Sequence, residues 1–466
     1  MIAARRALRR RGLLRGSPRA ETPGLRRGAP CLLHARGATE SEGRGENGGR
    51  FGGKDPGARS AYVHLPFCKR KCFYCDFPVV ALGSEATGTE AEPPIFESYV
   101  NLLEREVGRY ASDAARGSSG GKKLDTVFFG GGTPSLIPPR QLERVLRRLD
   151  DTFGIEWEGA EISMECDPGT FDRRRLRDYI DLGVNRISMG VQSFDDRLLE
   201  LCGRSHTLRE VYQAIDDLHA ASPASWSIDL MFGLPHQSLR AWEKTLDEAV
   251  AAEPSHVSCY DLQVEEATPF ARWYEVGMAP LPDEDTSAEF FKMASRRLGS
   301  EGYSHYEISN YAREGHECRH NMAYWRNSPF YAFGLGSTSN LHGRRVQRPR
   351  KYKDYEAWVE DHDRRYLELE QRGSGGEAEE QVVLDRLLDE VMLSLRLKDG
   401  LRVAGLDETF GGCGIADVEA RIMDAVTVHI EKKLVLLSED GKSIRLSDPE
   451  GQLVSNSIIS DIFCKF

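Results

Sequence analysis

Residues 62–75 read Tyr62-Val63-His64-Leu65-Pro66-Phe67-Cys68-Lys69-Arg70-Lys71-Cys72-Phe73-Tyr74-Cys75. In this stretch a short β-rich run leads directly into three cysteines, and the fold can be inferred from it outward. Three thiolates in so short a segment can serve one metal centre. A structural zinc site normally takes four protein ligands, and a disulfide framework takes an even number of cysteines. Three ligands suit a 4Fe–4S cube whose fourth iron stays open for a ligand. Zinc stays an alternative, with His64 or Asp76 as the fourth ligand.

Beyond this stretch the chain alternates short apolar runs with amphipathic helical runs, from residue 61 to about residue 312. Several runs are nearly continuous in apolar residues, as strands buried on both faces are. Such repeats predict right-handed crossovers and a parallel sheet, so we expect an α/β fold with an open, partial (βα)6 barrel. Ligands of such sheets bind at the carboxyl ends of the strands. The predicted strands are Ala61–Leu65, Thr126–Phe129, Glu161–Cys166, Arg186–Val191, Trp226–Phe232 and His256–Gln263.

The spacing C-x-x-x-C-x-x-C after the first strand of an α/β repeat resembles the radical S-adenosylmethionine (SAM) superfamily. The resemblance implies that Cys68, Cys72 and Cys75 ligate a 4Fe–4S cluster whose open iron chelates SAM. It also implies that one electron from the reduced cluster cleaves a carbon–sulfur bond of SAM. The cluster would then need an external electron donor, such as a ferredoxin or a flavodoxin-type reductant.

Polar or glycine residues follow the successive predicted strands. Each of them alone is more often a helix cap or an ion-pair partner. Together they offer the dispersed partners that a zwitterionic sulfonium with a ribose and an adenine needs, with Arg204 suited to the SAM carboxylate. The resemblance implies that SAM is contacted by Tyr62, Tyr74, Gly131, Gly132, Thr133, Glu165, Gln192, Arg204 and Asp229.

Within the superfamily the chain resembles the HemN/HemW branch, the oxygen-independent coproporphyrinogen III oxidases and their relatives, from about Ala61 to Phe466. The oxidases carry a fourth cysteine two residues after the third, a position that Phe77 fills here. Their basic amino-terminal extension also has no recognisable counterpart. The Cys75-Asp76-Phe77 ending resembles the heme-chaperone group, which implies delivery of heme to hemoproteins. Oxidative decarboxylation of coproporphyrinogen III stays the alternative activity.

A second mark of that group is His320-Asn321-Met322-Ala323-Tyr324-Trp325, which matches its heme-associated pattern H-N-x-x-Y-W. A neutral imidazole is a common axial ligand of heme iron. The resemblance implies heme contacts from His320, Asn321, Tyr324 and Trp325. The residues alone favour an ordinary hydrogen-bonded histidine beside core aromatics. His316, Cys318 and His320 alternate, so a strand here would place all three on one face.

Charge divides the chain. Residues 1–36 hold ten of the 62 basic residues and one of the 73 acidic residues, a local charge of +9. The other residues carry 52 bases and 72 acids, a net charge of −20, which disfavours nucleic acid as a partner. Composition therefore predicts an organelle-targeting presequence, with scarce serine favouring a mitochondrion over a plastid. No apolar run is long enough for a membrane span.

These features predict five segments along the chain. We also expect that the chain can form a homodimer. The helix-like runs Gln381–Leu397 and Val418–Lys432 and the β-like end Ser443–Leu453 predict a small winged-helix-like α+β module. The expected segments are a presequence over 1–36, a glycine-rich linker over 37–60, the radical SAM barrel over 61–312, a heme-motif and connecting region over 313–371, and the carboxy-terminal domain over 372–466.

Overall fold

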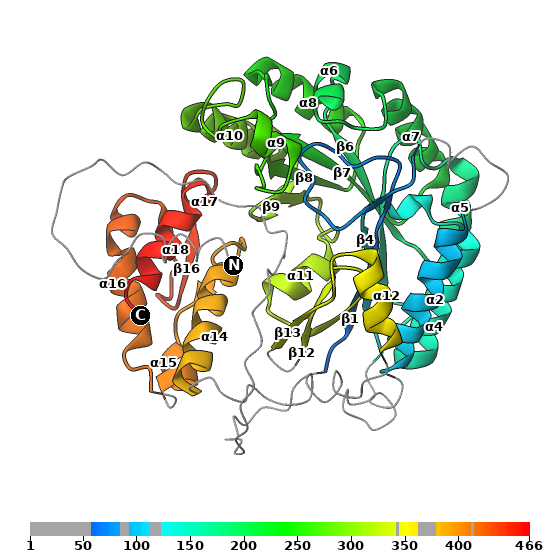
Figure 1. Ribbon diagram of the computed structural model, residues 1–466. Coiled ribbons are helices and arrows are strands. Elements are labelled where there is room, and N and C mark those ends of the chain that lie inside the picture. The colour runs from blue at the N-terminus through cyan, green and yellow to red at the C-terminus, as the bar shows by residue number, and fades with distance from the viewer. Residues whose placement is uncertain (1–56, 84–92, 111–122, 342–343, 362–378, 412–413) are drawn as a thin grey trace.

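The computed structural model describes residues 57–83, 93–110, 123–341, 344–361, 379–411 and 414–466 (Figure 1). The predicted presequence and most of the predicted linker lie outside these residues. The first strand begins at Ser60, the last residue of the predicted linker. Within the described residues, no helix has the length and apolar character that a bilayer span requires.

Six parallel strands form the centre of an open sheet and confirm the predicted α/β repeat. Their order follows the chain, and every neighbouring pair is parallel. The open, partial barrel is therefore confirmed. The strands are β1 (Ser60–Leu65), β4 (Thr126–Gly131), β5 (Glu161–Cys166), β6 (Arg186–Gln192), β7 (Ser225–Phe232) and β8 (His256–Asp261).

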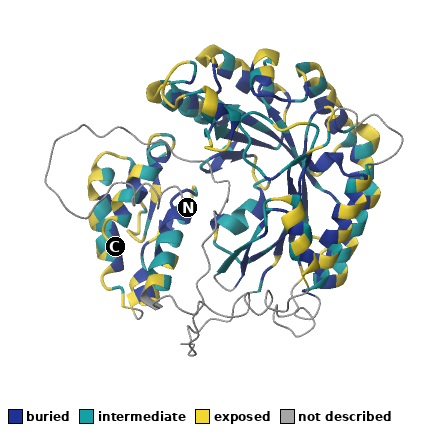
Figure 2. Cartoon of the chain, viewed as in Figure 1, coloured by how far each residue is buried: buried dark blue, intermediate teal, exposed yellow. Residues whose placement is uncertain are grey.

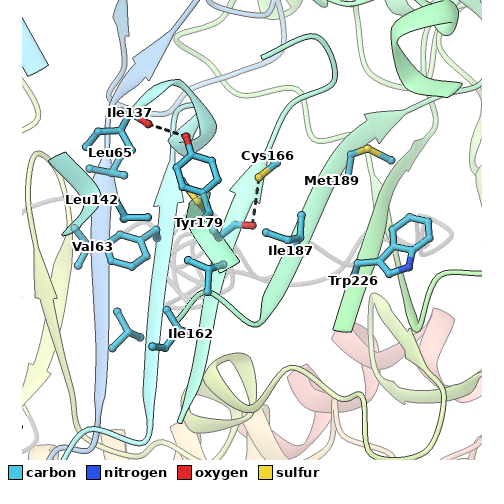
Figure 3. Packing of buried hydrophobic residues seen from close by; sticks show 14 of the residues in the cluster. Val63, Leu65, Ile137, Leu142, Ile162, Cys166, Tyr179, Ile187, Met189 and Trp226 are labelled. Carbon is cyan, nitrogen blue, oxygen red and sulfur yellow. Dashed lines mark hydrogen bonds between the residues drawn. The ribbon is translucent and has the colours of Figure 1, made fainter. Parts of the chain in front are cut away.

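Alternation along these strands separates a helix-covered face from a polar interior, because successive strand side chains point to opposite faces. Val63, Ile162 and Ile187 pack outward beneath the helices, where Tyr179 donates its hydroxyl to the carbonyl of Ile137 (Figure 3). The intervening side chains, such as Tyr62 and Glu165, face inward. The covering helices are α2 (Pro94–Gly108), α4 (Pro139–Phe153), α5 (Arg173–Asp181), α6 (Asp196–Leu201), α7 (Leu208–Ala221), α8 (Leu239–Ala251), α9 (Pro269–Trp273) and α10 (Glu284–Ser300).

The sheet continues past the expected boundary at residue 312. The strand β11 (Phe330–Phe333) lies parallel to β1, so the region expected only to connect two domains extends the sheet on that side. No strand–helix repeat is recognisable in the sequence before Phe330, and the pairing of β11 with β1 joins segments far apart in the chain. The remaining strands of the sheet are antiparallel: β9 (Ser304–Glu307), β10 (Asn310–Ala312), β12 (Thr338–Leu341) and β13 (Arg344–Gln347), and α12 (Tyr352–Glu360) follows them.

The carboxy-terminal module has its own apolar core beside the sheet (Figure 2). Its small antiparallel sheet and surrounding helices agree with the predicted α+β composition. The predicted β-like end is wrong after Leu446, because Pro449 lacks the N–H that a strand would donate and a helix begins at Glu450. The elements are α14 (Glu379–Ser394), β14 (Leu401–Arg402), α15 (Leu406–Phe410), α16 (Val418–Glu431), β15 (Val435–Leu437), β16 (Ser443–Leu446), α17 (Glu450–Leu453) and α18 (Ser455–Phe463).

Candidate cluster, cofactor and heme sites

The cysteine loop leaves β1 at the carboxyl end of the sheet, as predicted. Backbone bonds fasten it on both sides: the N–H of Phe73 donates to the carbonyl of Cys202 at 3.0 Å, and the N–H of Phe270 donates to the carbonyl of Phe73 at 3.1 Å. Gly203 has φ of +71°, and a Cβ there would lie 2.9 Å from the Phe73 ring. The loop is therefore held by the segment after α6 and by α9.

The three cysteines of this loop are free thiols of intermediate exposure. Among the described residues, no group of three His, Cys, Asp or Glu side chains is arranged to hold a metal ion. Burial raises the pKa of Cys68 to about 12 and that of Cys75 to about 11. Both thiols therefore need a bound cation to ionise at neutral pH.

The glycine-rich turn at the end of β4 donates backbone hydrogen bonds to the segment that leads into the cysteine loop. The N–H of Gly132 donates to the carbonyl of Leu65 at 2.9 Å, and that of Thr133 donates to the carbonyl of Phe67 at 2.6 Å. A Cβ at Gly131, whose φ is +117°, would lie 2.5 Å from the His64 ring. Glycine is therefore required for this close approach. The Thr133 hydroxyl donates to Cys68 Sγ at 3.7 Å.

Two carboxyl groups lie in the interior near this turn. Glu165 accepts the N–H of Gly131 at 2.9 Å, and burial raises its pKa to about 8. Asp229 accepts the hydroxyls of Ser188 at 2.8 Å and Ser258 at 2.6 Å, and burial raises its pKa as well. Desolvation disfavours their charged forms, so a cationic ligand placed between them would stabilise the carboxylates.

Gln192 shows the clearest sign of an external partner. The register of β6 shifts between Gly190 and Gln192, and Gln192 has φ of +68°, which re-aims its side chain. Its Oε1 atom is buried and accepts no hydrogen bond from the described residues. Buried polar atoms are normally paired, so a ligand that donates a hydrogen bond fits this position.

Arg204 links the polar interior to the cysteine loop. Its guanidinium is buried and donates to Cys72 Sγ at 3.5 Å, to the Tyr74 hydroxyl at 3.3 Å and to the carbonyl of Gly190 at 2.8 Å. It also forms an ion pair with Asp167. Arg204 is therefore already engaged by Asp167 in this conformation, which the sequence did not indicate.

Tyr62 lies one inward-facing position nearer the amino-terminal end of the sheet than Glu165 does. Its ring stacks on Phe128 at a centroid distance of 6.1 Å. Its hydroxyl bonds to Nδ1 of His64 at 3.1 Å, while Nε2 of His64 bonds to the carbonyl of Pro78 at 2.9 Å. A carbonyl can only accept, so Nε2 carries the proton and Tyr62 donates to Nδ1.

Sequence reasoning missed three polar residues of this site, and it considered His64 only as a zinc ligand. All four support the residues that it did predict, and the alternation of the strands was the only signal for two of the missed three. The missed residues are Asp167, Ser188 and Ser258.

The H-N-x-x-Y-W segment lies at the opposite, amino-terminal end of the strands. It forms the helix α11 (Arg319–Trp325), so His316, Cys318 and His320 do not share the single face that a strand would give them. Glu161 at the start of β5 accepts the N–H groups of Arg319 at 2.9 Å and His320 at 3.0 Å. This long-range cap starts the helix and could not be read from the local sequence.

His320 is fully buried against the sheet. Its Nδ1 bonds to the Thr126 hydroxyl at 2.8 Å, its Nε2 bonds to the Tyr324 hydroxyl at 2.7 Å, and its ring stacks on Phe128 at 5.2 Å. Burial lowers its pKa to about 3, so the imidazole is neutral. To ligate a heme iron, one ring nitrogen must first release its partner.

The other residues of the segment face different surroundings. Tyr324 packs edge-on against Phe330 at 4.5 Å, and Asn321 is half-buried. Trp325 is buried in the apolar core of the carboxy-terminal module, beside residues such as Leu387. The segment therefore contacts the sheet through His320 and the core of the module through Trp325.

Comparisons with known proteins agree with this arrangement. The sequence profile of the Radical SAM superfamily matches residues 62–249. The protein named heme chaperone HemW from Synechocystis is 40% identical over 422 residues, which cover 87% of this chain and 96% of that protein. A zebrafish protein named radical S-adenosyl methionine domain-containing protein 1, mitochondrial, is 32% identical over 73% of each chain.

Among solved structures, the coproporphyrinogen III oxidase HemN from Escherichia coli superposes with a TM-score of 0.69. The superposition covers 89% of this chain and 92% of that one, at 20% sequence identity. At this identity the likeness concerns the fold.

Proposed function

We infer the function of this chain from its family, because it belongs to the HemW-type family of radical SAM proteins. We propose that it is a heme chaperone, which binds heme and passes it to hemoproteins. The observation that carries the proposal is the 40% identity to a protein named heme chaperone HemW across almost the whole length of that protein.

The proposal assigns the carboxyl end of the sheet to the cluster and SAM. Cys68, Cys72 and Cys75 would hold the 4Fe–4S cluster, and Thr133 and Arg204 would donate hydrogen bonds to its thiolates. When bound, the cluster and SAM would supply one-electron cleavage of a carbon–sulfur bond. The predicted SAM residues stay as proposed: Tyr62, Tyr74, Gly131, Gly132, Thr133, Glu165, Gln192, Arg204 and Asp229.

The charges of the site support a ligand that carries both signs. Glu165 and Asp229 would suit an ammonium or sulfonium group, and the orphan Oε1 of Gln192 would accept a donor. Arg204 would suit a carboxylate, provided that it shares its charge with Asp167.

The cysteine loop also suggests how an electron donor would dock. Arg70 and Lys71 are exposed on it, and Phe73 packs edge-on at 5.0 Å against Trp273, which is 54% exposed. A cationic rim with an exposed aromatic residue fits a small acidic carrier, such as a ferredoxin or a flavodoxin-type reductant.

The proposal assigns the heme to the segment around α11. His320 stays the sequence-based candidate for an iron ligand, on the condition that its bond to Tyr324 opens. Tyr324, Asn321 and Trp325 stay predicted heme residues. In the described conformation Tyr324 packs against the sheet and Trp325 packs in the core of the module.

We further propose a mitochondrial location, because the names of animal relatives describe those proteins as mitochondrial. Import of residues 1–60 fused to a reporter, into isolated mitochondria and chloroplasts in parallel, tests it. Import into chloroplasts alone would favour the plastid alternative. Light scattering of the purified chain tests the proposed homodimer.

Anaerobic reconstitution with iron and sulfide, followed by heme titration with and without SAM, tests the proposed function. We expect about four iron atoms per chain and saturable heme binding. Zinc without iron or sulfide would contradict the cluster assignment. Clear formation of the vinyl product from SAM and coproporphyrinogen III would instead favour the oxidase, against which Phe77 weighs.

A further inference from the structure

A cavity of about 690 Å³ lies beside α11 at the amino-terminal edge of the sheet. Its walls come from the amino-terminal ends of β1 and β4, from the α11 segment and from the loop after α14. The backbone ties these walls together: the N–H of Lys398 donates to the carbonyl of Tyr306 at 3.0 Å. A volume of this size is in the range of sites that hold small organic ligands.

One face of α11 lines this cavity. Its residues are Arg319, Met322, Ala323 and Arg326, which follow the spacing i, i+3, i+4, i+7 of a single helix face. His320 and Tyr324 lie on the face toward the sheet. His320, Tyr324 and Trp325 of the H-N-x-x-Y-W pattern therefore anchor the helix, while its two unspecified positions, Met322 and Ala323, line the cavity.

The lining has both an apolar and a cationic part. Met322, Ala323, Pro329 and Leu397 offer apolar surface to a flat ring system. Among the described residues that line the cavity, Met322 is the one side chain with a thioether, thiol or imidazole group, the soft or nitrogen donors common in heme proteins.

The basic side chains that line the cavity differ in how freely they could bind a carboxylate of a ligand. Arg59 pairs with Asp125 at 3.1 Å, and Arg319 donates to the carbonyl of Gly159 at 2.6 Å. Arg326 and Lys398 are exposed, and the Lys398 ammonium donates to the Ser304 hydroxyl at 3.2 Å. The acidic groups Glu317 and Asp399 also line the cavity, so carboxylates of a ligand would be directed toward Arg326 and Lys398.

We propose that this cavity is the heme seat, with the heme propionates on Arg326 and Lys398 and the iron facing Met322. This inference rests on the proposed heme-chaperone function and locates its cargo. In it, His320 is a positioning residue that holds α11 against the sheet. The macrocycle lies against the helix, at the edge of the contact through which Trp325 and Met322 pack on the core of the carboxy-terminal module.

Charge reversal of the two exposed cations tests the seat. Titration of hemin into the reconstituted full chain, followed by absorbance, is compared for the wild type, Arg326→Glu, Lys398→Glu and the control Arg174→Glu on exposed α5. We expect the cavity variants to bind hemin about ten-fold more weakly and the control to bind as the wild type does. With hemin dimethyl ester, which lacks free carboxylates, wild type and variants should bind alike.

Equal hemin affinity of the wild type and both cavity variants would overturn the seat while leaving the proposed function intact. Absence of saturable hemin binding by the wild type would overturn the proposed function itself. Iron content and thermal unfolding of each variant, with Arg326→Gln as a milder change, show whether the fold and cluster are retained.

The iron ligand has a separate spectroscopic test. Met322→Leu nearly conserves volume, so the helix should stay in place, and Met278→Leu at an exposed position is the matched control. We expect Met322→Leu alone to change the axial-ligand spectrum of ferric heme. An unchanged spectrum would overturn Met322 as the iron ligand, and a spectrum changed only by His320→Ala would return that role to His320.

Discussion

Three carboxyl groups and one guanidinium decide the charge of the interior at the carboxyl end of the sheet. Asp167 engages Arg204, whereas Glu165 accepts a backbone N–H group and Asp229 accepts two hydroxyl groups, all of them neutral donors. The region therefore has an excess of acid over base. A ligand with an ammonium or sulfonium group relieves this excess, and SAM carries both groups.

Substitution of single SAM residues should separate SAM binding from cluster binding. We expect Gln192→Ala and Asp229→Asn to weaken SAM binding about ten-fold, because each removes a polar partner without touching a cysteine. Equilibrium dialysis of the reconstituted chain with labelled SAM measures the affinity, and iron analysis checks the cluster. Exposed Gln213→Ala and Asp216→Asn on α7 are the controls. Normal SAM affinity in both site variants would refute these assignments.

Glu165 should make the stability of the chain depend on pH. Burial raises its pKa from 4.5 to about 8, so the folded chain keeps a proton that the unfolded chain releases. This stabilisation is complete below pH 4.5 and is lost as the pH rises through about 8. Glu165→Gln is neutral at every pH. We therefore expect its melting temperature, relative to the wild type, to rise by a few °C between pH 6 and pH 9.

Buried Glu307, whose pKa burial raises to about 7, contributes to the pH dependence of both chains and cancels in that comparison. A difference in melting temperature that stays constant across this pH range would contradict the raised pKa of Glu165.

At the scale of elements, the repeat of strands and helices was predictable because each strand is a local apolar run and parallel pairing follows from the crossovers. The strand β11 and the helix α11 were not predictable in this way. The former depends on pairing with β1, and the latter depends on Glu161, which accepts N–H groups from residues 158 and 159 positions away. Contacts between distant segments thus decided what local periodicity left open.

The residues of the candidate sites also differ in whether local sequence could predict them. The cysteines and the glycine turn were identifiable because their spacing is local and their chemistry is specific. Asp167 was not, since its role depends on the return of Arg204 from the segment after α6. The position of His320 was also not predictable, because its partner Thr126 comes from β4.

The helix α11 should depend on His320 for its position. His320→Ala removes bonds to Thr126 and Tyr324 and the stacking on Phe128, so we expect a loss of about 2–3 kcal/mol in the free energy of unfolding. Heme binding should weaken, while iron content stays normal. Denaturant unfolding and hemin titration measure these effects, with His316→Ala as the control. Unchanged stability together with unchanged heme spectra would exclude both roles of His320.

At the scale of the whole molecule, the two ends of the strands carry separate candidate sites. The cysteine loop leaves the carboxyl end of β1, whereas α11 covers the amino-terminal end, where Thr126 begins β4. The stacked rings of His320, Phe128 and Tyr62 lie between the two ends. The two sets of candidate residues do not overlap, so we expect that binding at one end does not require a ligand at the other.

Removal of the cluster ligands should accordingly leave heme binding in place. We expect Cys68→Ala/Cys72→Ala/Cys75→Ala to lose iron and sulfide but to bind hemin with an affinity within about three-fold of the wild type. Iron analysis and hemin titration of the same preparation measure both properties. Cys464→Ala, at an exposed position in the module, is the control. Loss of hemin binding in the folded triple variant would show that the cluster is part of the heme site.

Transfer of heme from the reconstituted chain to an apo-hemoprotein, followed anaerobically by absorbance, tests whether the chain is a heme chaperone. We expect heme transfer from the chain to be faster than from free hemin and to be slowed by substitutions in α11. We expect no vinyl product when coproporphyrinogen III and SAM are supplied. Transfer no faster than from free hemin, together with vinyl-product formation, would contradict the heme-chaperone function.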